Sequence, residues 1–259
     1  RIVLTGVTEN DYTNFDIASF SLGNNLDLQW KESYSASADY LSDDRAMDMT
    51  VDSTGSVLMA ASSCEVLKRA PDGTIVWTKS FKTIGGTSFL VNFARIEVDT
   101  AGNSYLLFGG MVDYSPTGEN NTKTVLVKYD KEGNLIWYRK SDICYPRKLI
   151  IDAKQDILTV NQGDENWGRV VVIRKFRKNG DPAFEKRYPQ SSIEIVEGML
   201  DSESNLWLFS NHSLTDLANL SSSNLLISRY DSLGTDLDSL VWNSEYQLQE
   251  SVKQVRPFR

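Results

Sequence analysis

The sequence predicts an all-β fold, a β-propeller of four-stranded antiparallel blades, and two observations carry this prediction. First, two short phrases alternate along the chain, and residues 129–137 (YDKEGNLIW) and 97–105 (EVDTAGNSY) show them most clearly. Second, Gly, Asp and Asn separate runs of Val, Ile, Leu, Tyr and Trp that partly alternate with polar residues, a pattern typical of short strands joined by tight turns. A repeat of roughly 50 residues that holds four such strands is typical of a propeller blade.

Four strands are expected in each repeat, named A to D from the innermost outwards. Strand A is predicted at 46–52, 94–99, 147–152, 194–200 and 252–257. Strand B is predicted at 1–7, 57–61, 104–109, 157–161 and 206–210. Strand C is predicted at 17–22, 66–70, 125–130, 170–176 and 225–230. Strand D is predicted at 28–34, 75–81, 135–140, 183–188 and 240–246.

The turns within the repeat favour the same interpretation. Most of them carry Asp three residues before Gly, because the carboxylate can accept hydrogen bonds from the turn backbone while Gly supplies a positive φ. The glycines in this place are Gly55, Gly73, Gly102, Gly133, Gly180 and Gly234. Gln155 and Ser204 replace glycine in two A–B turns, so these two turns need another solution.

The two ends of the chain have complementary phases. Residues 1–7 match strand B and residues 252–257 match strand A, so joining the end to the start completes one repeat. We therefore expect a single domain, 1–259, with five repeats at roughly 1–43, 44–91, 92–145, 146–192 and 193–250, and with 251–259 closing the first blade. Such closure removes an exposed sheet edge. The alternative is a piece of a longer array.

Composition limits the classes of partner. The chain of 259 residues carries a net charge of −8, which disfavours nucleic acid because that affinity depends on Lys and Arg neutralising phosphates. No run of about 18 apolar residues occurs, so no membrane span is predicted. The sequence begins at Arg1 without a secretory signal, so we expect a processed or trimmed chain, and a lipid anchor outside it stays open.

Little in the sequence indicates catalysis, and neither a cofactor nor a metal is predicted. The single histidine, His212, excludes a zinc site with several histidines, and no nucleophile-elbow phrase, phosphate loop or dinucleotide fingerprint occurs. Cys64 and Cys144 are expected to be unpaired. The 35 acidic residues leave a pair of glycosidase carboxylates open, although abundance alone is no signal.

The phrases resemble the bacterial SBBP-type β-propeller repeat. The match consists of Asp130, Gly133, Asn134 and Trp137 in one phrase and of Asp99, Gly102, Asn103 and Tyr105 in the other. Residues 70–77 are also similar to the PQQ-like propeller repeat. Individual repeats depart from the pattern, and in the fourth repeat Phe184 replaces Trp. Because such repeats are frequent in surface and secreted proteins of Bacteroidota-like bacteria, the resemblance implies an extracytoplasmic location: cell surface, periplasm or secreted. It says little about activity.

One face of the predicted propeller carries the longer and more variable connections. Strand direction alternates, so the A–B and C–D turns emerge on one face and the B–C and D–A connections on the other, which we call the long-loop face. Variable loops on a rigid scaffold are where binding residues concentrate. These connections are predicted at 8–14, 35–44, 82–92, 111–123, 163–169 and 212–223. The candidate binding residues in them are Tyr12, Tyr40, Phe89, Tyr114 and Trp167, with Asp39 and Asp164.

These features together predict a non-catalytic interaction or scaffold propeller in a bacterial envelope or secreted assembly. Its long-loop face would bind a protein or a glycan, because aromatic rings provide contact area and carboxylates provide hydrogen-bond acceptors. The alternative is a carbohydrate-active enzyme, a glycoside hydrolase or lyase, with paired carboxylates at the channel mouth. A PQQ-type dehydrogenase is a third hypothesis. The partner, the ligand and the oligomeric state lie beyond what the sequence indicates.

Overall fold

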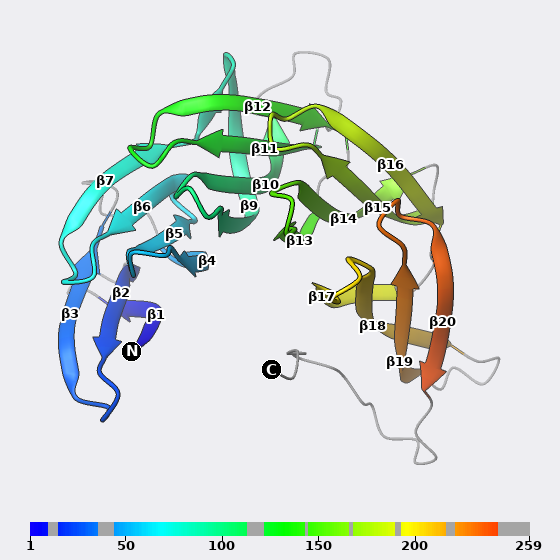
Figure 1. Cartoon of the computed structure of the whole chain (residues 1–259), viewed down its shortest axis with the longest axis horizontal. Helices are drawn as coiled ribbons and strands as arrows, with labels where there is room; N and C mark the ends of the chain where they lie inside the picture. Colours follow the sequence, from blue (N-terminus) through cyan, green and yellow to red (C-terminus); the bar gives the residue numbers. More distant parts are fainter. Residues whose placement is uncertain are drawn as a thin grey trace. The chain divides into compact units, whose positions relative to one another are not determined.

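The computed structural model describes residues 1–9, 15–35, 44–112, 122–142, 145–165, 168–189, 193–215 and 221–242. These residues form strands and turns without a helix, and all neighbouring strands pair antiparallel (Figure 1). Within the described part of the chain, no helix is long and apolar enough to cross a membrane. The predicted all-β class is thus confirmed.

The strands form five sheets. The first sheet contains β1 (Ile2–Glu9), β2 (Phe15–Leu22) and β3 (Leu28–Tyr34). The second contains β4 (Ala46–Val51), β5 (Val57–Ala61), β6 (Glu65–Arg69) and β7 (Ile75–Ser80). The third contains β8 (Thr83–Ile84), β9 (Thr87–Val98), β10 (Ser104–Val112), β11 (Thr122–Tyr129) and β12 (Leu135–Ser141). The fourth contains β13 (Tyr145–Ile151), β14 (Ile157–Glu165), β15 (Gly168–Phe176) and β16 (Pro182–Pro189). The fifth contains β17 (Ile193–Leu200), β18 (Leu206–Thr215), β19 (Ser221–Tyr230) and β20 (Asp236–Trp242).

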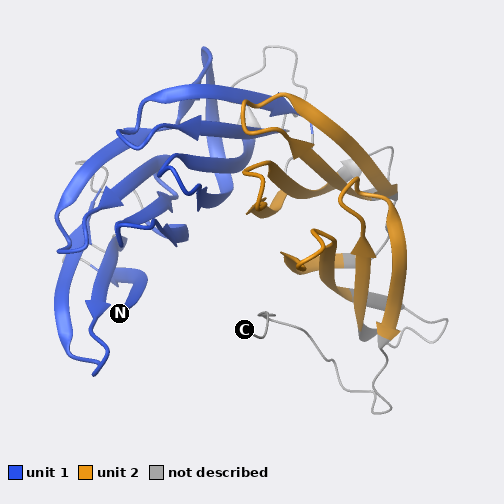
Figure 2. Ribbon diagram, in the orientation of Figure 1, with its two compact units in different colours: residues 1–144 blue, residues 145–259 orange. Residues whose placement is uncertain are grey.

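The chain divides into two compact units, Arg1–Cys144 with the first three sheets and Tyr145–Arg259 with the last two (Figure 2). Strands A to D follow one another in chain order in the second, fourth and fifth sheets, as predicted. The first sheet has strands B, C and D only, and the segment 252–257 predicted to complete it lies outside the described residues. The single-domain arrangement and the ring closure therefore stay predictions.

The turns use one backbone pattern throughout. In the turn after β9, the amide of Asp99 donates to the carbonyl of Asn103 at 2.9 Å, and the amide of Gly102 donates to the carbonyl of Asp99 at 3.0 Å. The Asp99 carboxylate also accepts from the amides of Ala101 and Asn103. Gly102 has a φ of +84°, as the sequence pattern predicts. These bonds satisfy the turn backbone locally, which makes each turn a rigid element.

The two A–B turns that lack glycine keep this pattern with a left-handed residue, as does the C–D turn of the first sheet with Leu26. Gln155 has a φ of 65° and Ser204 a φ of 66°. A left-handed conformation costs a residue with a side chain about 1–2 kcal/mol. The Asp152 and Asp201 carboxylates compensate, because each accepts two backbone hydrogen bonds within its turn.

The connection predicted at 82–92 is a hairpin rather than a long loop. β8 pairs with β9 through Gly85 and Gly86, whose φ values are +57° and +75°. Two successive residues with positive φ form the tight turn that suits a two-residue hairpin. Strands B and C of the last two sheets are also longer than predicted, since β14 reaches Glu165 and β18 reaches Thr215. The long-loop face is thus more strongly structured than the sequence indicates.

Each unit buries its own hydrophobic side chains between neighbouring sheets. In the first unit, Leu58, Ile96 and Phe108 belong to one cluster, and a smaller cluster joins Ile17 to Met59. In the second unit, Val160, Ile173 and Leu208 form the cluster between the fourth and fifth sheets. These clusters fix adjacent sheets within each unit and so position the turns at their ends.

Candidate functional site

A buried ion pair recurs beneath the A–B turns. The ammonium group of Lys68 lies 2.9 Å from the Asp52 carboxylate, and that of Lys175 lies 2.7 Å from the Asp152 carboxylate. Lys128 and Asp99 are equivalent in the third sheet, at 3.8 Å. Strand C therefore contributes a lysine to the carboxylate that organises the neighbouring turn.

The ion pairs with Lys68 and Lys175 favour the ionised form of the Asp52 and Asp152 carboxylates. Burial by itself would raise the pKa of Asp52 and Asp152, but hydrogen bonds from the turn and from the paired lysine hold each pKa below its ordinary value. The pKa of Asp201 is also lowered, to about 2, because hydrogen bonds from Trp207, Asn205 and Glu203 outweigh the effect of burial. A glycosidase needs one carboxylic acid with a raised pKa. These turn carboxylates have the opposite property, so they do not support the hydrolase hypothesis.

A tryptophan seals the boundary between neighbouring sheets in the first unit. The Trp30 ring packs on Gly73 and its indole N–H donates to the carbonyl of Pro71 at 2.8 Å. The Trp77 ring packs on Gly133 in the same way, and its N–H donates to the carbonyl of Lys131 at 3.0 Å. Gly is required under each ring, because a Cβ at Gly133 would lie 2.9 Å from Cδ2 of Trp77. We call the second arrangement the Trp77 junction.

Phe184 takes the corresponding place between the fourth and fifth sheets. Strand register establishes the equivalence, since Trp77 pairs with Lys68 and Phe184 pairs with Lys175. The Phe184 ring covers Gly234, where a Cβ would lie 2.6 Å from Cε2 of the ring. A phenyl ring has no N–H to donate to the turn carbonyl. We call this arrangement the Phe184 junction.

Trp242 does not occupy the place of Trp30 and Trp77 near the start of strand D. In the fifth sheet Asp238 pairs with Arg229 at the equivalent place, and Trp242 pairs with Leu225 at the end of β20. The extra residues between Gly234 and Trp242 shift the tryptophan along the strand.

A hollow of about 350 Å³ opens beside Phe184, and we call it the junction hollow. Its walls come from both turns of the fourth sheet, from the start of β16 and from two turns of the fifth sheet. The lining residues are Asp152, Lys154, Asp156, Lys175, Arg177, Ala183, Phe184, Ser204, Ser232 and Leu233. Ligand sites in proteins have volumes of roughly 300–1,000 Å³, so the junction hollow lies at the lower end of that range.

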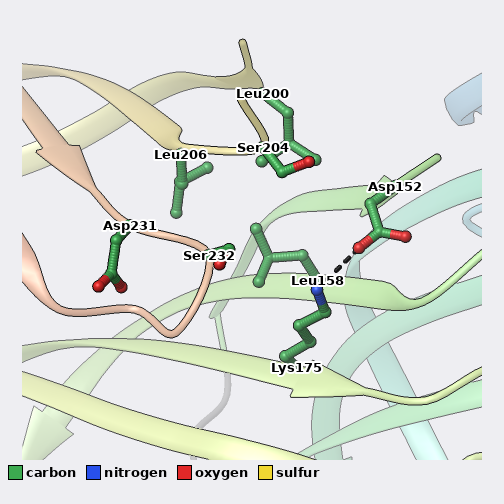
Figure 3. A pocket seen from close by; sticks show the side chains of 8 residues that line it. All are labelled: Asp152, Leu158, Lys175, Leu200, Ser204, Leu206, Asp231 and Ser232. Carbon is green, nitrogen blue, oxygen red and sulfur yellow. Dashed lines mark hydrogen bonds and ion pairs between the residues drawn. The ribbon is translucent and has the colours of Figure 1, made fainter. Parts of the chain in front are cut away.

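An inner pocket lies against the junction hollow and shares four of its residues, Asp152, Lys175, Ser204 and Ser232. Its volume of about 10 Å³ matches one water molecule. Figure 3 shows the Lys175–Asp152 pair on one side of it and the turn with Asp231 and Ser232 on the other. The apolar part of its lining consists of Leu158, Leu200 and Leu206.

Some charged side chains of the junction hollow form ion pairs, and others do not. The Lys175 ammonium pairs with the Asp152 carboxylate at 2.7 Å and lies 3.7 Å from the Asp156 carboxylate, so these three groups form one ion-pair cluster with a net charge of −1. Lys154 and Arg177 are exposed, and their side chains form no ion pair or hydrogen bond with the described residues. The lining of the hollow thus contains two available cations together with the Phe184 ring. Among the described residues, no group of three His, Cys, Asp or Glu side chains could hold a metal ion.

Most of the binding residues predicted from the sequence fall outside the described residues. These are Tyr12, Asp39, Tyr40, Tyr114 and Trp167. Asp164 lies within β14 and pairs with Arg169, so it is part of a strand rather than of a loop. Phe89 lies in β9 with no exposed surface and packs edge-to-face on Phe108, with ring centroids 5.3 Å apart. Its ring belongs to the core, because the hairpin with β8 folds it inwards.

The junction hollow was not predicted, because its residues belong to turns that the repeat already explains. A signal for it is nevertheless present in the sequence. Three departures from the repeat meet at the Phe184 junction: Phe184 replaces Trp, and Gln155 and Ser204 replace Gly in the adjoining A–B turns. Departures that cluster in space mark a place where the requirements of the scaffold are relaxed.

Comparisons with known proteins support the fold. No protein-family model and no curated protein matches the sequence. Among solved structures, the chain is similar to BBS1N in complex with ARL6DN, with a TM-score of 0.51, 12% identity and coverage of 91% of this chain and 67% of that one. It is also similar to the Dos1 propeller, with a TM-score of 0.54, 11% identity and coverage of 90% and 57%. A mutant of the Synechocystis apocarotenoid oxygenase gives a TM-score of 0.50 and 10% identity, with coverage of 92% and 65%.

These neighbours show the fold alone, because their sequences are so distant. The chain is a β-propeller, built from antiparallel sheets of three to five strands in its described part. It spans about two thirds or less of the length of these solved structures.

Proposed function

We propose that this propeller is a non-catalytic scaffold that binds a protein partner. The observation that carries the proposal is the character of the outermost strands. Large apolar side chains stand in solvent on β7, β12 and β20, with exposed fractions between 46% and 61%. The residues are Ile75, Val76, Leu135, Ile136, Leu237, Leu240 and Val241.

The same strands also offer unpaired backbone. Within the described residues, β7, β12 and β20 each pair with a neighbouring strand on one side only. An exposed edge with apolar side chains is a template for another polypeptide, which can add a strand and cover the side chains at once. A protein segment satisfies both requirements, whereas a glycan cannot add a strand to the sheet.

The proposal is tested by co-purification from the native source, with a variant that carries Val76→Lys, Ile136→Lys and Leu240→Lys. We expect partners recovered with the wild type to be lost with this variant, because lysine on an edge strand opposes pairing. Ser53→Lys is the control, since Ser53 is exposed and polar but lies in an A–B turn, outside the outer strands. Recovery of the same partners with the triple variant would disprove the role of the outer strands.

A second contact surface is proposed on the long-loop face. Support comes from the sequence, which places Tyr12, Tyr40, Tyr114 and Trp167 there beside Asp39 and Asp164. A partner on this face could be a protein or a glycan. Alanine substitution of Tyr40, Tyr114 and Trp167 should then weaken binding of the co-purified partner, and unchanged affinity would remove this surface from the proposal.

The location proposed for the protein is extracytoplasmic, in an envelope or secreted assembly of a Bacteroidota-like bacterium. The support is the resemblance of residues 97–105 and 129–137 to SBBP-type repeats. Cleavage by proteinase added to intact cells of the source organism tests a surface location, and extraction of periplasmic proteins tests the alternative. Recovery only with the cytoplasmic fraction would contradict it.

We also propose that residues 252–257 pair with β1 and complete the first sheet, closing a ring of five blades. The support is that β1 has a partner on one side only among the described residues and exposes Ile2 and Leu4. Val255→Pro would remove a ladder donor from that segment and should lower the unfolding temperature. An unchanged unfolding temperature would argue against closure.

A further inference from the structure

The junction hollow exists because a smaller ring stands where tryptophan stands elsewhere. At the Trp77 junction the indole spans the space between the sheets and ends in a hydrogen bond to the next turn. At the Phe184 junction the phenyl ring covers Gly234 but donates nothing to the turn of Ser232. Ser232 and Leu233 of that turn line the hollow together with Phe184. The unfilled space therefore has an aromatic wall and a polar turn opposite it.

The basic residues at this place are specific to the fourth sheet. Arg177 opens its C–D turn, and the residues that open the other four C–D turns are Gly23, Ala70, Asp130 and Asp231. Lys154 is the third residue of its A–B turn, where the other described A–B turns have Thr54, Ala101 and Glu203. Two cations thus replace neutral or acidic residues at the hollow, although the chain as a whole carries a net charge of −8.

The acidic residues of the hollow cancel its cations only in part. Lys175 offsets the charge of one of the two carboxylates Asp152 and Asp156, so the lining, which also includes Lys154 and Arg177, keeps a net charge of +1. Asp231 lines only the inner pocket, and its carboxylate accepts hydrogen bonds from the amides of Leu233 and Thr235 in its own turn. The exposed rim is therefore positive, and it attracts negative charge towards the Phe184 ring.

We propose that the junction hollow binds an acidic peptide segment that inserts one aromatic side chain. The ring would lie against Phe184 and Leu233, where aromatic contacts are favourable in offset or edge-to-face geometry. Carboxylates beside the ring would reach Lys154 and Arg177, since a guanidinium group forms strong charge-assisted hydrogen bonds with carboxylates. This site is separate from the outer strands on which the proposed function rests, so the two can fail independently.

The experiment uses three fluorescein-labelled peptides of the same length, Asp-Trp-Asp, Asp-Ala-Asp and Lys-Trp-Lys, with fluorescence anisotropy as the readout. The wild-type chain should bind Asp-Trp-Asp about tenfold more tightly than either of the others, a difference of about 1.4 kcal/mol, because each of the other peptides lacks either the ring or the carboxylates. Equal binding of Asp-Trp-Asp and Asp-Ala-Asp would show that no ring is recognised. Absence of binding at millimolar peptide would overturn the proposal.

Two substitutions test whether the peptide binds in the junction hollow. Phe184→Trp should fill the hollow as Trp77 fills its own junction, and so reduce binding about tenfold or more while the protein stays folded. Arg177→Glu should weaken Asp-Trp-Asp by a similar factor, whereas Lys178→Glu in the same turn should not, because Lys178 does not line the hollow. Circular dichroism checks that each variant is folded.

The outcomes also separate this inference from the proposed function. Binding that survives both Phe184→Trp and Arg177→Glu would overturn the assignment to the junction hollow. The triple variant of the outer strands should keep full affinity for Asp-Trp-Asp, because those strands take no part in the site. Loss of Asp-Trp-Asp binding in that variant would instead show that the outer strands bind the peptide.

Discussion

The Trp77 junction and the Phe184 junction are built from the same repeat but differ in one ring. Both place an aromatic side chain from strand D on the glycine of the next C–D turn. At the Trp77 junction the indole N–H reaches the Lys131 carbonyl, and the gap between the sheets is sealed. At the Phe184 junction the ring stops short, and a hollow of about 350 Å³ remains. A scaffold can thus gain a site by losing one structural contact, while the backbone stays the same.

The difference extends to the surroundings of the two rings. The A–B turn of the second sheet has Gly55 at its left-handed position, whereas the fourth sheet has Gln155 there. The neighbouring positions are Thr54 and Ala70 in the second sheet but Lys154 and Arg177 in the fourth. Several unfavourable or costly choices therefore gather at one junction, which is the pattern expected where function competes with stability.

The largest expected difference concerns the buried carboxylates. Asp52→Ala leaves the Lys68 ammonium buried without a partner and removes three turn hydrogen bonds, so we expect the free energy of unfolding to fall by about 3–5 kcal/mol. Asp152→Ala should cost less, because Asp156 remains 3.7 Å from the Lys175 ammonium. Unfolding in urea measures both. If Asp152→Ala proved equally costly, Asp156 would not stabilise the Lys175 ammonium, and the pair of Lys175 with Asp156 would contribute nothing to the fold.

Exchanging the rings tests the junctions directly. Trp77→Phe should lower the free energy of unfolding by about 1–2 kcal/mol, because it removes the hydrogen bond to Lys131 and part of the packing on Gly133. Phe184→Trp should have the opposite sign, with a gain of up to about 1 kcal/mol. The pair is measured in the same urea experiment. A loss of stability in Phe184→Trp would mean that the hollow is too small or too wet to accept an indole ring.

Acid should destabilise the protein through the same carboxylates. Although burial opposes it, hydrogen bonds and the paired lysines lower the pKa of Asp52 and Asp152 in the folded state. A carboxyl group with a lowered pKa stabilises the fold above its ordinary value, and the stabilisation disappears as the pH falls through the folded-state pKa. We expect urea midpoints that are steady near neutral pH and fall below about pH 4. Asp152→Asn should show a shallower fall than the wild type, and an identical fall would exclude Asp152 as a contributor.

The sequence predicts the scaffold well because the scaffold is made of local signals. Most glycines at the left-handed positions, the Asp that opens most of the turns and most strand centres follow from the repeat, and Gly55, Gly102 and Gly133 adopt the expected φ. The lengths of the strands and of their connections are less predictable. The hairpin through Gly85 and Gly86 converts an expected loop into two strands, and it carries Phe89 from a candidate surface into the core. That outcome depends on packing against Phe108, which is distant in the chain.

The junction hollow could not be predicted from the pattern of any single repeat. Its lining comes from turns about 50 residues apart in the repeat, whose proximity depends on how neighbouring sheets pack. Each residue taken alone, such as Ser204 or Lys154, is an ordinary turn residue. The informative signal is comparative, because Phe184, Gln155 and Ser204 are three departures from the repeat that belong to one pair of neighbouring sheets.

The smallest expected effects come from the left-handed turn positions, and a reciprocal exchange measures them. Gly55→Gln should lower the free energy of unfolding by about 1 kcal/mol, since a side chain is strained at the φ of +83° although a Cβ there would meet only ordinary contacts. Gln155→Gly should raise it by about 0.5 kcal/mol, because relief of the strain is partly offset by the greater flexibility of glycine in the unfolded chain and by the lost bond from Gln155 to the Asp152 carbonyl. Equal signs in the two variants would mean that Gln155 is favoured where it stands. The strain at the Phe184 junction would then be absent, and only the missing indole would distinguish it from the Trp77 junction.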